Sequence, residues 1–74
     1  MTTTDSANQI ARKLRKARES VGLSQEEVAA KLAKTQSYVS RCETGNRRLD
    51  IFELEAFAML YSKPLADFLP SEPE

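Results

Sequence analysis

The 74-residue sequence contains no histidine and no tryptophan, one cysteine, two glycines and three prolines. Without histidine, and with a single thiol, the chain offers neither a Cys/His cluster for zinc nor a histidine that could act as a general base. A chain of this length buries only about 60 % of its unfolded surface, which leaves little room for a deep cleft. We therefore expect no enzymatic activity, no metal or other cofactor and no small-molecule ligand.

Long hydrophobic runs are also missing. No apolar run approaches the roughly 20 residues that a membrane span requires, and the first residues, MTTTDSANQ, lack the basic and apolar regions of a secretory signal. A secreted domain of this size more often carries paired cysteines than a single Cys42. We expect a soluble cytoplasmic protein without membrane contact. Cys42 is better explained as a buried core residue than as a redox switch.

The chain has no net charge, because eleven lysines and arginines balance eleven acidic residues. The basic and acidic residues are nevertheless distributed unevenly along the chain. Residues 1–48 carry ten basic and five acidic side chains, whereas residues 49–74 carry one basic and six acidic side chains. Such a bipolar chain can turn its basic part toward a polyanion while its acidic part points away. Neutrality should weaken non-specific binding to nucleic acid without preventing specific binding.

A helix start is present at Ser24. Its hydroxyl can accept a hydrogen bond from the amide of Glu27 while the Glu27 carboxylate reaches back to the Ser24 amide, which is a capping box. Leu23 and Val28 can pack against each other outside that box as a hydrophobic staple. The pattern predicts a helix over about residues 25–33.

A second helix start follows about eleven residues later, at Thr35. Thr35 can cap a helix over residues 36–44, and Gly45 can take the left-handed conformation that ends it. Only Val39 and Cys42 are apolar at helical spacing in this segment. The two starts with a short polar break between them predict a helix-turn-helix.

The outward positions of the second helix form a wholly polar stripe: Gln36, Ser37, Ser40, Arg41 and Thr44. Serine and threonine are weaker helix formers than the residues that usually fill a solvated face. In the major groove glutamine can pair with adenine, arginine with guanine, and serine or threonine with several base edges. The stripe therefore indicates base recognition, with a merely solvated helix face as the alternative.

The runs GLSQEEVAAKL and TQSYVSRCETG resemble the Cro/repressor-type (XRE) helix-turn-helix family. The resemblance implies an all-α, compact, five-helix, lambda-repressor-like DNA-binding domain. In such a domain helices 2 and 3 form the helix-turn-helix, and helix 3 enters the major groove of double-stranded DNA. The sequence departs from the family at Cys42, where a larger apolar residue is common, and at Ala33-Lys34, where the family usually has Gly-Val. Either the turn at Ala33 is less relaxed, or Ala33 takes the left-handed conformation at a cost.

The resemblance implies a sequence-specific transcriptional regulator, either a repressor or an autoregulator, of prokaryotic or phage type, nucleoid-associated when bound. The residues expected to read bases are Gln36, Ser37, Ser40 and Arg41. The residues expected to contact phosphate are Gln25, Tyr38, Asn46 and Arg47, with the role of Tyr38 the least defined. An N-terminal helix position such as that of Gln25 attracts anions, although simple solvation is the alternative there. Arg48 could contact phosphate too or pack on helix 4.

The resemblance also implies a partly buried ion pair between Arg18 in helix 1 and Glu43 in helix 3. Helix 1 itself is predicted by apolar residues at i, i+4, i+7 and i+11, which are Ile10, Leu14, Ala17 and Val21. We expect this helix to begin at a cap near Ser6, paired with Gln9, and to end at Gly22. Residues 1–6 should form a disordered tail, residues 7–70 a single helix-turn-helix domain, and residues 71–74 a second disordered tail.

A third capping box, Asp50 with Glu53, predicts a fourth helix that reaches about Tyr61. Its core stripe consists of Leu54, Phe57, Ala58 and Tyr61. Pro64 should open a short fifth helix at its first position, and Pro70 should stop it.

Further apolar residues lie outside the core stripe, and we expect them to form a homodimer interface made of Phe52, Met59, Phe68 and Leu69. The alternative is that Phe52 and Leu69 complete the small core. Family members commonly pair through this region, which sets two recognition helices ~34 Å apart on a palindromic operator.

A rival interpretation is a protein-interaction module of the same fold, such as an antitoxin, a coactivator or an adaptor. The zero net charge and the apolar C-terminal helices favour it. The polar stripe on the second helix argues against it, because an apolar docking surface has no need of such residues.

Overall fold

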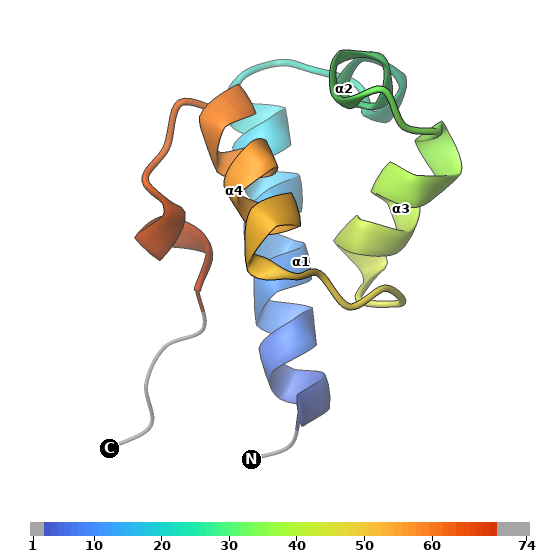
Figure 1. Cartoon of the computed structure of the whole chain (residues 1–74). Helices are drawn as coiled ribbons and strands as arrows, with labels where there is room; N and C mark the ends of the chain where they lie inside the picture. Colours follow the sequence, from blue (N-terminus) through green and yellow to red (C-terminus); the bar gives the residue numbers. More distant parts are fainter. Residues whose placement is uncertain (1–2, 70–74) are drawn as a thin grey trace.

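Four α-helices and one short 3₁₀-helix make up the described part of the chain. The computed structural model describes residues 3–69, with side chains from residue 8 onward. The elements are α1 (Thr3–Ser20), α2 (Gln25–Leu32), α3 (Gln36–Thr44), α4 (Ile51–Leu60) and the 3₁₀-helix η1 (Leu65–Phe68). In Figure 1, α3 and η1 lie on opposite sides of α1, and both contact it. The predicted all-α helix-turn-helix architecture is confirmed.

Side-chain caps define the starts of α2, α3 and α4. The Ser24 hydroxyl accepts from the Glu27 amide at 3.0 Å, and the Ser24 amide donates to the Glu27 carboxylate at 2.8 Å. Asp50 and Glu53 form the same reciprocal pair at 2.8 and 3.0 Å. The Thr35 hydroxyl accepts an amide of the first turn of α3 at 3.1 Å. All three predicted starts are therefore confirmed, because each cap uses only residues close in sequence.

Each of the four α-helices is followed by a residue in the left-handed conformation: Gly22 (φ 75°), Ala33 (φ 58°), Gly45 (φ 81°) and Ser62 (φ 56°). In each case the next amide donates back to a carbonyl of the last helical turn at 2.8 to 3.2 Å, as in a Schellman motif. Two of these positions hold a residue with a Cβ, which makes the left-handed region costly. The turn at Ala33 therefore keeps the standard geometry, and Ala33 bears the strain.

The start of α1 differs from the prediction, whereas its end at Gly22 is confirmed, because Gly22 is left-handed and the Leu23 amide donates back to the Arg18 carbonyl at 3.2 Å. The helix begins at Thr3, so Ser6 lies inside it, and the predicted tail boundary at residue 6 does not match its start. Helix propagation explains the extension, because each added residue contributes one backbone hydrogen bond without a new nucleation cost. Val21, which shares the predicted helical spacing with Leu14 and Ala17, is 43 % exposed, whereas Leu14 and Ala17 are buried. The last residue of α1 is Ser20, and Val21 follows it with its amide donating to the Ala17 carbonyl at 3.2 Å. The predicted disorder of residues 1–2 and 71–74 lies outside the described residues.

The predicted fifth helix is a single 3₁₀ turn, Leu65–Phe68, and Pro64 precedes it instead of occupying its first position. Leu69 is extended, with φ −76° and ψ 148°. A residue before proline is disfavoured in the α conformation, and Leu69 precedes Pro70 in the sequence. The segment between the two prolines is therefore too short for a regular α-helix.

A row of aromatic rings crosses the core from α3 to η1. The ring centroids of Tyr38 and Phe57 are 6.3 Å apart, those of Phe57 and Tyr61 6.1 Å, and those of Tyr61 and Phe68 6.4 Å. Phe68 is 1 % exposed, so its assignment to a dimer interface is wrong. The physical reason is that η1 turns this ring inward against α4, where it completes a core too small to close without it.

Replacement of Ala33 by glycine should raise the free energy of unfolding by about 1 kcal/mol, because glycine has no Cβ to strain in the left-handed region. Chemical denaturation followed by circular dichroism measures the change. The matched control is Ala30→Gly at an exposed position inside α2, where glycine should lower stability by about 1 kcal/mol. A loss of stability in both variants would contradict the assigned strain.

Candidate nucleic-acid interface

The two faces of α3 are cleanly separated. Val39 is fully buried and Cys42 is 2 % exposed, so the narrow apolar face is turned into the core. The opposite face carries the predicted stripe, of which Gln36, Ser37, Arg41 and Thr44 are exposed and Ser40 is partly exposed. This arrangement leaves polar donors and acceptors on the solvent-exposed side of α3.

Cys42 fills core volume beneath the stripe. Its side chain belongs to the hydrophobic core cluster, and burial raises the pKa of the thiol to about 11. The thiol is therefore protonated at neutral pH, which makes it a poor nucleophile and a poor redox centre.

A buried ion pair joins α3 to α1. Arg18 donates from Nε to Glu43 Oε2 at 2.7 Å and from Nη2 to Glu43 Oε1 at 3.1 Å, in the bidentate geometry that favours arginine. The side chains are only 12 % and 2 % exposed. Arg18 also donates from Nη1 to the carbonyl of Leu23 at 2.9 Å, which adds the start of the helix-turn-helix to the same cluster. The hydrogen bond to Glu43 raises the pKa of Arg18. The predicted Arg18–Glu43 pair is present.

The ion pair continues into the first residue of the polar stripe. Gln25 donates from Nε2 to Glu43 Oε1 at 3.1 Å. Gln36 in turn donates from Nε2 to Gln25 Oε1 at 2.6 Å. The amide of Gln25 therefore bridges the buried charge and the exposed head of α3. The sequence does not predict this link, because Gln25 and Gln36 belong to different helices and no local pattern pairs them.

Tyr38 and Arg47 belong to a separate cluster at the start of α4, here called the Glu53 cluster (Tyr38, Arg47 and Glu53). Glu53 Oε2 accepts from Arg47 Nη2 at 2.6 Å and from the Tyr38 hydroxyl at 3.1 Å. The Arg47 guanidinium also lies over the Tyr38 ring, 4.9 Å from its centroid. Arg47 lowers the pKa of Glu53, with the Asp50 amide as the second cause, whereas burial raises the pKa of Tyr38. Tyr38 thus faces α4 and lies outside the exposed stripe.

The two adjacent arginines take different positions. Arg47 contacts α4 through Glu53. Arg48 is exposed and makes no ion pair with the side chains of residues 8–69. Packing on helix 4 was one of the two expectations for Arg48, but in the structure Arg47 makes the ion pair with α4. Asn46 is exposed beside them in the same loop.

The residues expected at a dimer interface differ in their exposure to solvent. Phe52 and Met59 are 76 % and 75 % exposed, and Leu69 is 40 % exposed, so Phe52 does not complete the core. Together with the exposed Ala56, Phe52 and Met59 follow the spacing i, i+4, i+7 on one side of α4. This uncovered row is called the α4 stripe.

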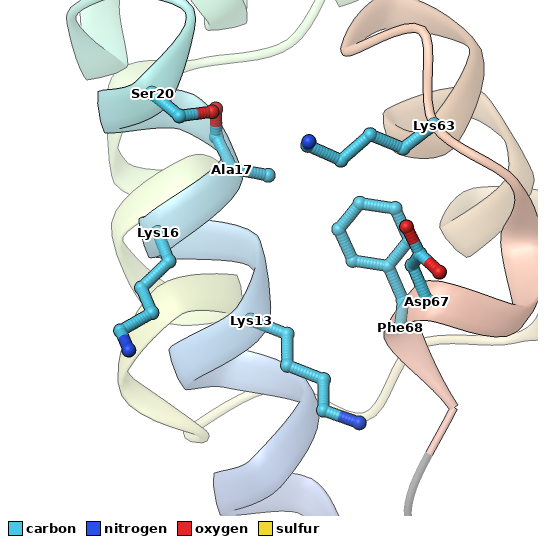
Figure 2. Close-up of a pocket in the computed structure, with 7 residues that line it drawn as sticks. All are labelled: Lys13, Lys16, Ala17, Ser20, Lys63, Asp67 and Phe68. Atoms are coloured by element: carbon cyan, nitrogen blue, oxygen red, sulfur yellow. The ribbon is translucent and has the colours of Figure 1, made fainter.

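A shallow hollow of about 320 Å³ lies between α1 and η1, lined in part by Lys13, Lys16, Lys63 and the ring of Phe68. Figure 2 shows that the ammonium of Lys16 points away from this ring. Lys13 donates to the carbonyl of Leu69 at 2.7 Å and so fastens the segment after η1 to α1. The three ammonium groups therefore do not converge on one ligand position.

Within residues 3–69 no helix is long and apolar enough to cross a bilayer. Residues 8–69, whose side chains the structure describes, contain no group of three or more acidic or thiol side chains that could hold a metal ion.

A family model described as a helix-turn-helix domain matches residues 9–67. The chain belongs to this helix-turn-helix family. The resemblance to the XRE type is also confirmed, because the DNA-binding domain of BldD is 30 % identical with a TM-score of 0.84, over 93 % of this chain and 100 % of that one. The BldD DNA-binding domain of S. venezulae is 31 % identical with a TM-score of 0.80, over 89 % and 99 % of the two chains.

Two further solved structures, each 23 % identical to this chain, resemble it in fold only. The restriction-modification controller protein C.AhdI from Aeromonas hydrophila is 23 % identical with a TM-score of 0.85, over 93 % of this chain and 100 % of that one. Hydroxypropylphosphonic acid epoxidase from S. wedmorenis is 23 % identical with a TM-score of 0.84, over 92 % of this chain and 36 % of that one. No curated protein matches the chain.

In this helix-turn-helix domain, removal of either Arg18 or Glu43 should lower the free energy of unfolding by about 3 to 5 kcal/mol, because the remaining charge is buried without a partner. The Arg18→Met, Glu43→Leu and double variants, measured by chemical denaturation, form a double-mutant cycle. The double variant should lose much less than the sum of the two single losses.

The matched control is the exposed pair Arg15–Glu19 on the same helix, whose side chains are 65 % and 53 % exposed. Its cycle should give a coupling of about 0.5 kcal/mol or less. Equal coupling in the two cycles would contradict a stabilising role for the burial of Arg18 and Glu43.

Proposed function

We propose that this protein is a sequence-specific double-stranded DNA-binding transcriptional regulator, a repressor or autoregulator, that inserts α3 into the major groove. The observation that carries the proposal is the exposed polar stripe on a helix whose other face is buried. Membership of the helix-turn-helix family and identities of 30 % and 31 % to DNA-binding domains of BldD support it.

In the proposed complex, Gln36, Ser37, Ser40 and Arg41 read base edges. The bond from Gln36 Nε2 to Gln25 leaves Gln36 Oε1 and one amide hydrogen for adenine. Since Gln25 is itself held by the buried Glu43, Gln36 is oriented before DNA arrives. Arg41 is exposed and can reach guanine through two parallel hydrogen bonds.

Contacts to phosphate position the helix on the backbone without reading sequence. We assign them to Gln25, Asn46 and Arg47. Gln25 retains one amide hydrogen, and it begins α2, where free backbone amides favour an anion. Tyr38 can join them only if its hydroxyl leaves Glu53.

We further propose that two copies pair through the α4 stripe. Phe52 and Met59 present large apolar side chains at 76 % and 75 % exposure, which a soluble monomer rarely leaves open as a contiguous row. Packing of the stripe on its own copy about a two-fold axis buries both at once. Such a dimer would present two α3 helices to a palindromic operator, with half-sites ~34 Å apart.

The decisive experiment is the selection of bound sequences from random duplex DNA. Enrichment of one palindromic motif is the expected result. Failure to enrich any motif would overturn the proposal and favour the alternative, a protein-interaction module of the same fold.

Arg41→Ala should cost about 1 to 3 kcal/mol on the selected site and relax preference at one base pair. Arg47→Ala should instead weaken selected and random duplexes by the same factor, because a phosphate contact carries no sequence information. Fluorescence anisotropy with both duplexes measures the two effects. Equal loss on both duplexes for Arg41→Ala would argue against base reading by this residue.

Met59→Glu should shift the protein from dimer to monomer in analytical ultracentrifugation at micromolar concentration, because a charge in the centre of an apolar interface is costly. Ala30→Glu on the exposed side of α2 adds the same charge elsewhere and should leave the dimer intact. A wild-type protein that sediments only as a monomer would count against pairing in the absence of DNA.

A further inference from the structure

The carboxylate of Glu53 is held from several sides. Its Oε1 accepts from the Asp50 amide at 3.0 Å as part of the capping box of α4. Its Oε2 accepts from Arg47 at 2.6 Å and from the Tyr38 hydroxyl at 3.1 Å. The side chain of Glu53 is 19 % exposed. The backbone and α3 together therefore keep this negative charge in one position.

Arg47 is more exposed than Glu53, although its guanidinium also lies over the Tyr38 ring. Its side chain is 41 % exposed, and its ion pair in the structure is the one to Glu53. It lies in the loop between α3 and α4, three residues after the last residue of the helix that carries the polar stripe. When a phosphate approaches this loop, Arg47 can turn toward it, whereas Glu53 cannot follow without breaking the cap of α4.

These two facts place a fixed carboxylate and a nucleic-acid phosphate in competition for one guanidinium. We propose that Glu53 is an intramolecular competitor of the DNA backbone for Arg47 and so limits the affinity of the protein for every DNA sequence. The inference rests on the proposed function, in which Arg47 contacts phosphate.

The competition acts on the sequence-independent part of binding. Each phosphate that a basic side chain neutralises strengthens binding to specific and non-specific DNA alike and adds about 0.9 to the slope of log affinity against log salt. An arginine that must first leave a carboxylate contributes less than a free one. Base reading by Arg41 is untouched, because Arg41 makes no ion pair with the side chains that the structure describes, those of residues 8–69.

Glu53→Gln is the test, because glutamine can keep the capping box of α4 while losing the charge. The variant should bind both the selected and a random duplex about two- to fivefold more tightly, as expected for release of a partly exposed ion pair. The slope of log affinity against log salt should change by less than one phosphate contact, because Arg47 contacts phosphate in both proteins. Circular dichroism checks that the fold is kept.

Two controls separate this effect from a general change in charge. Glu55→Gln removes a charge from an exposed position on the same helix and should change affinity much less. In the Arg47→Ala background, Glu53→Gln should have no effect, since the contested guanidinium is gone. Arg47→Ala should also cost more affinity in the Glu53→Gln background than in the wild type.

The possible failures are distinguishable. Wild-type protein that binds no duplex overturns both the proposed function and this inference. Wild-type binding with an unchanged or weaker Glu53→Gln variant overturns the inference alone. An equal gain in the Glu55→Gln variant, or a gain that persists without Arg47, also overturns it, because the effect would then come from overall charge.

Discussion

The Arg18–Glu43 ion pair is the interaction on which the rest of the arrangement depends. Helix α3 fully buries only two apolar side chains, Val39 and Cys42, and Tyr38 packs against the core in part, which is little apolar surface to hold a nine-residue helix in place. The bidentate pair supplies the missing attachment to α1 with both side chains largely buried. Such a pair need not stabilise the fold more than apolar residues would, but it requires one geometry to satisfy its hydrogen bonds. It therefore sets the position of α3 as well as its attachment.

The same ion pair reaches the surface through two glutamines. Gln25 accepts from Gln36 and donates to Glu43, so the head of the polar stripe is connected to a buried charge by hydrogen bonds of 2.6 and 3.1 Å. A side chain oriented in advance loses less conformational entropy when it binds. The buried Glu43 thus orients Gln36, through Gln25, for the base contact that the proposed function assigns to it.

The basic part of the chain (residues 1–48) and the acidic part (residues 49–74) meet at the junction of α3 and α4. Arg47 belongs to the basic part and Glu53 to the acidic part, and they form an ion pair beside the loop that follows the polar stripe. The opposite charges of the two parts can orient the molecule in the field of a polyanion, and here they also form a direct ion pair. At this point the acidic part lies close enough to neutralise a side chain that the proposed interface would use.

The sequence determined the features that depend on near neighbours. The caps at Ser24, Thr35 and Asp50 and the polar stripe of α3 could be predicted because capping and helical periodicity act within a few residues. Family resemblance added the Arg18–Glu43 pair. Only the tertiary structure decided the burial of side chains near the helix ends and the contacts between side chains of different helices. In the folded chain Val21 is exposed and Phe68 is buried. Arg47 forms an ion pair with Glu53, and Gln36 donates a hydrogen bond to Gln25. These outcomes depend on contacts between separate elements, which no local pattern of residues encodes.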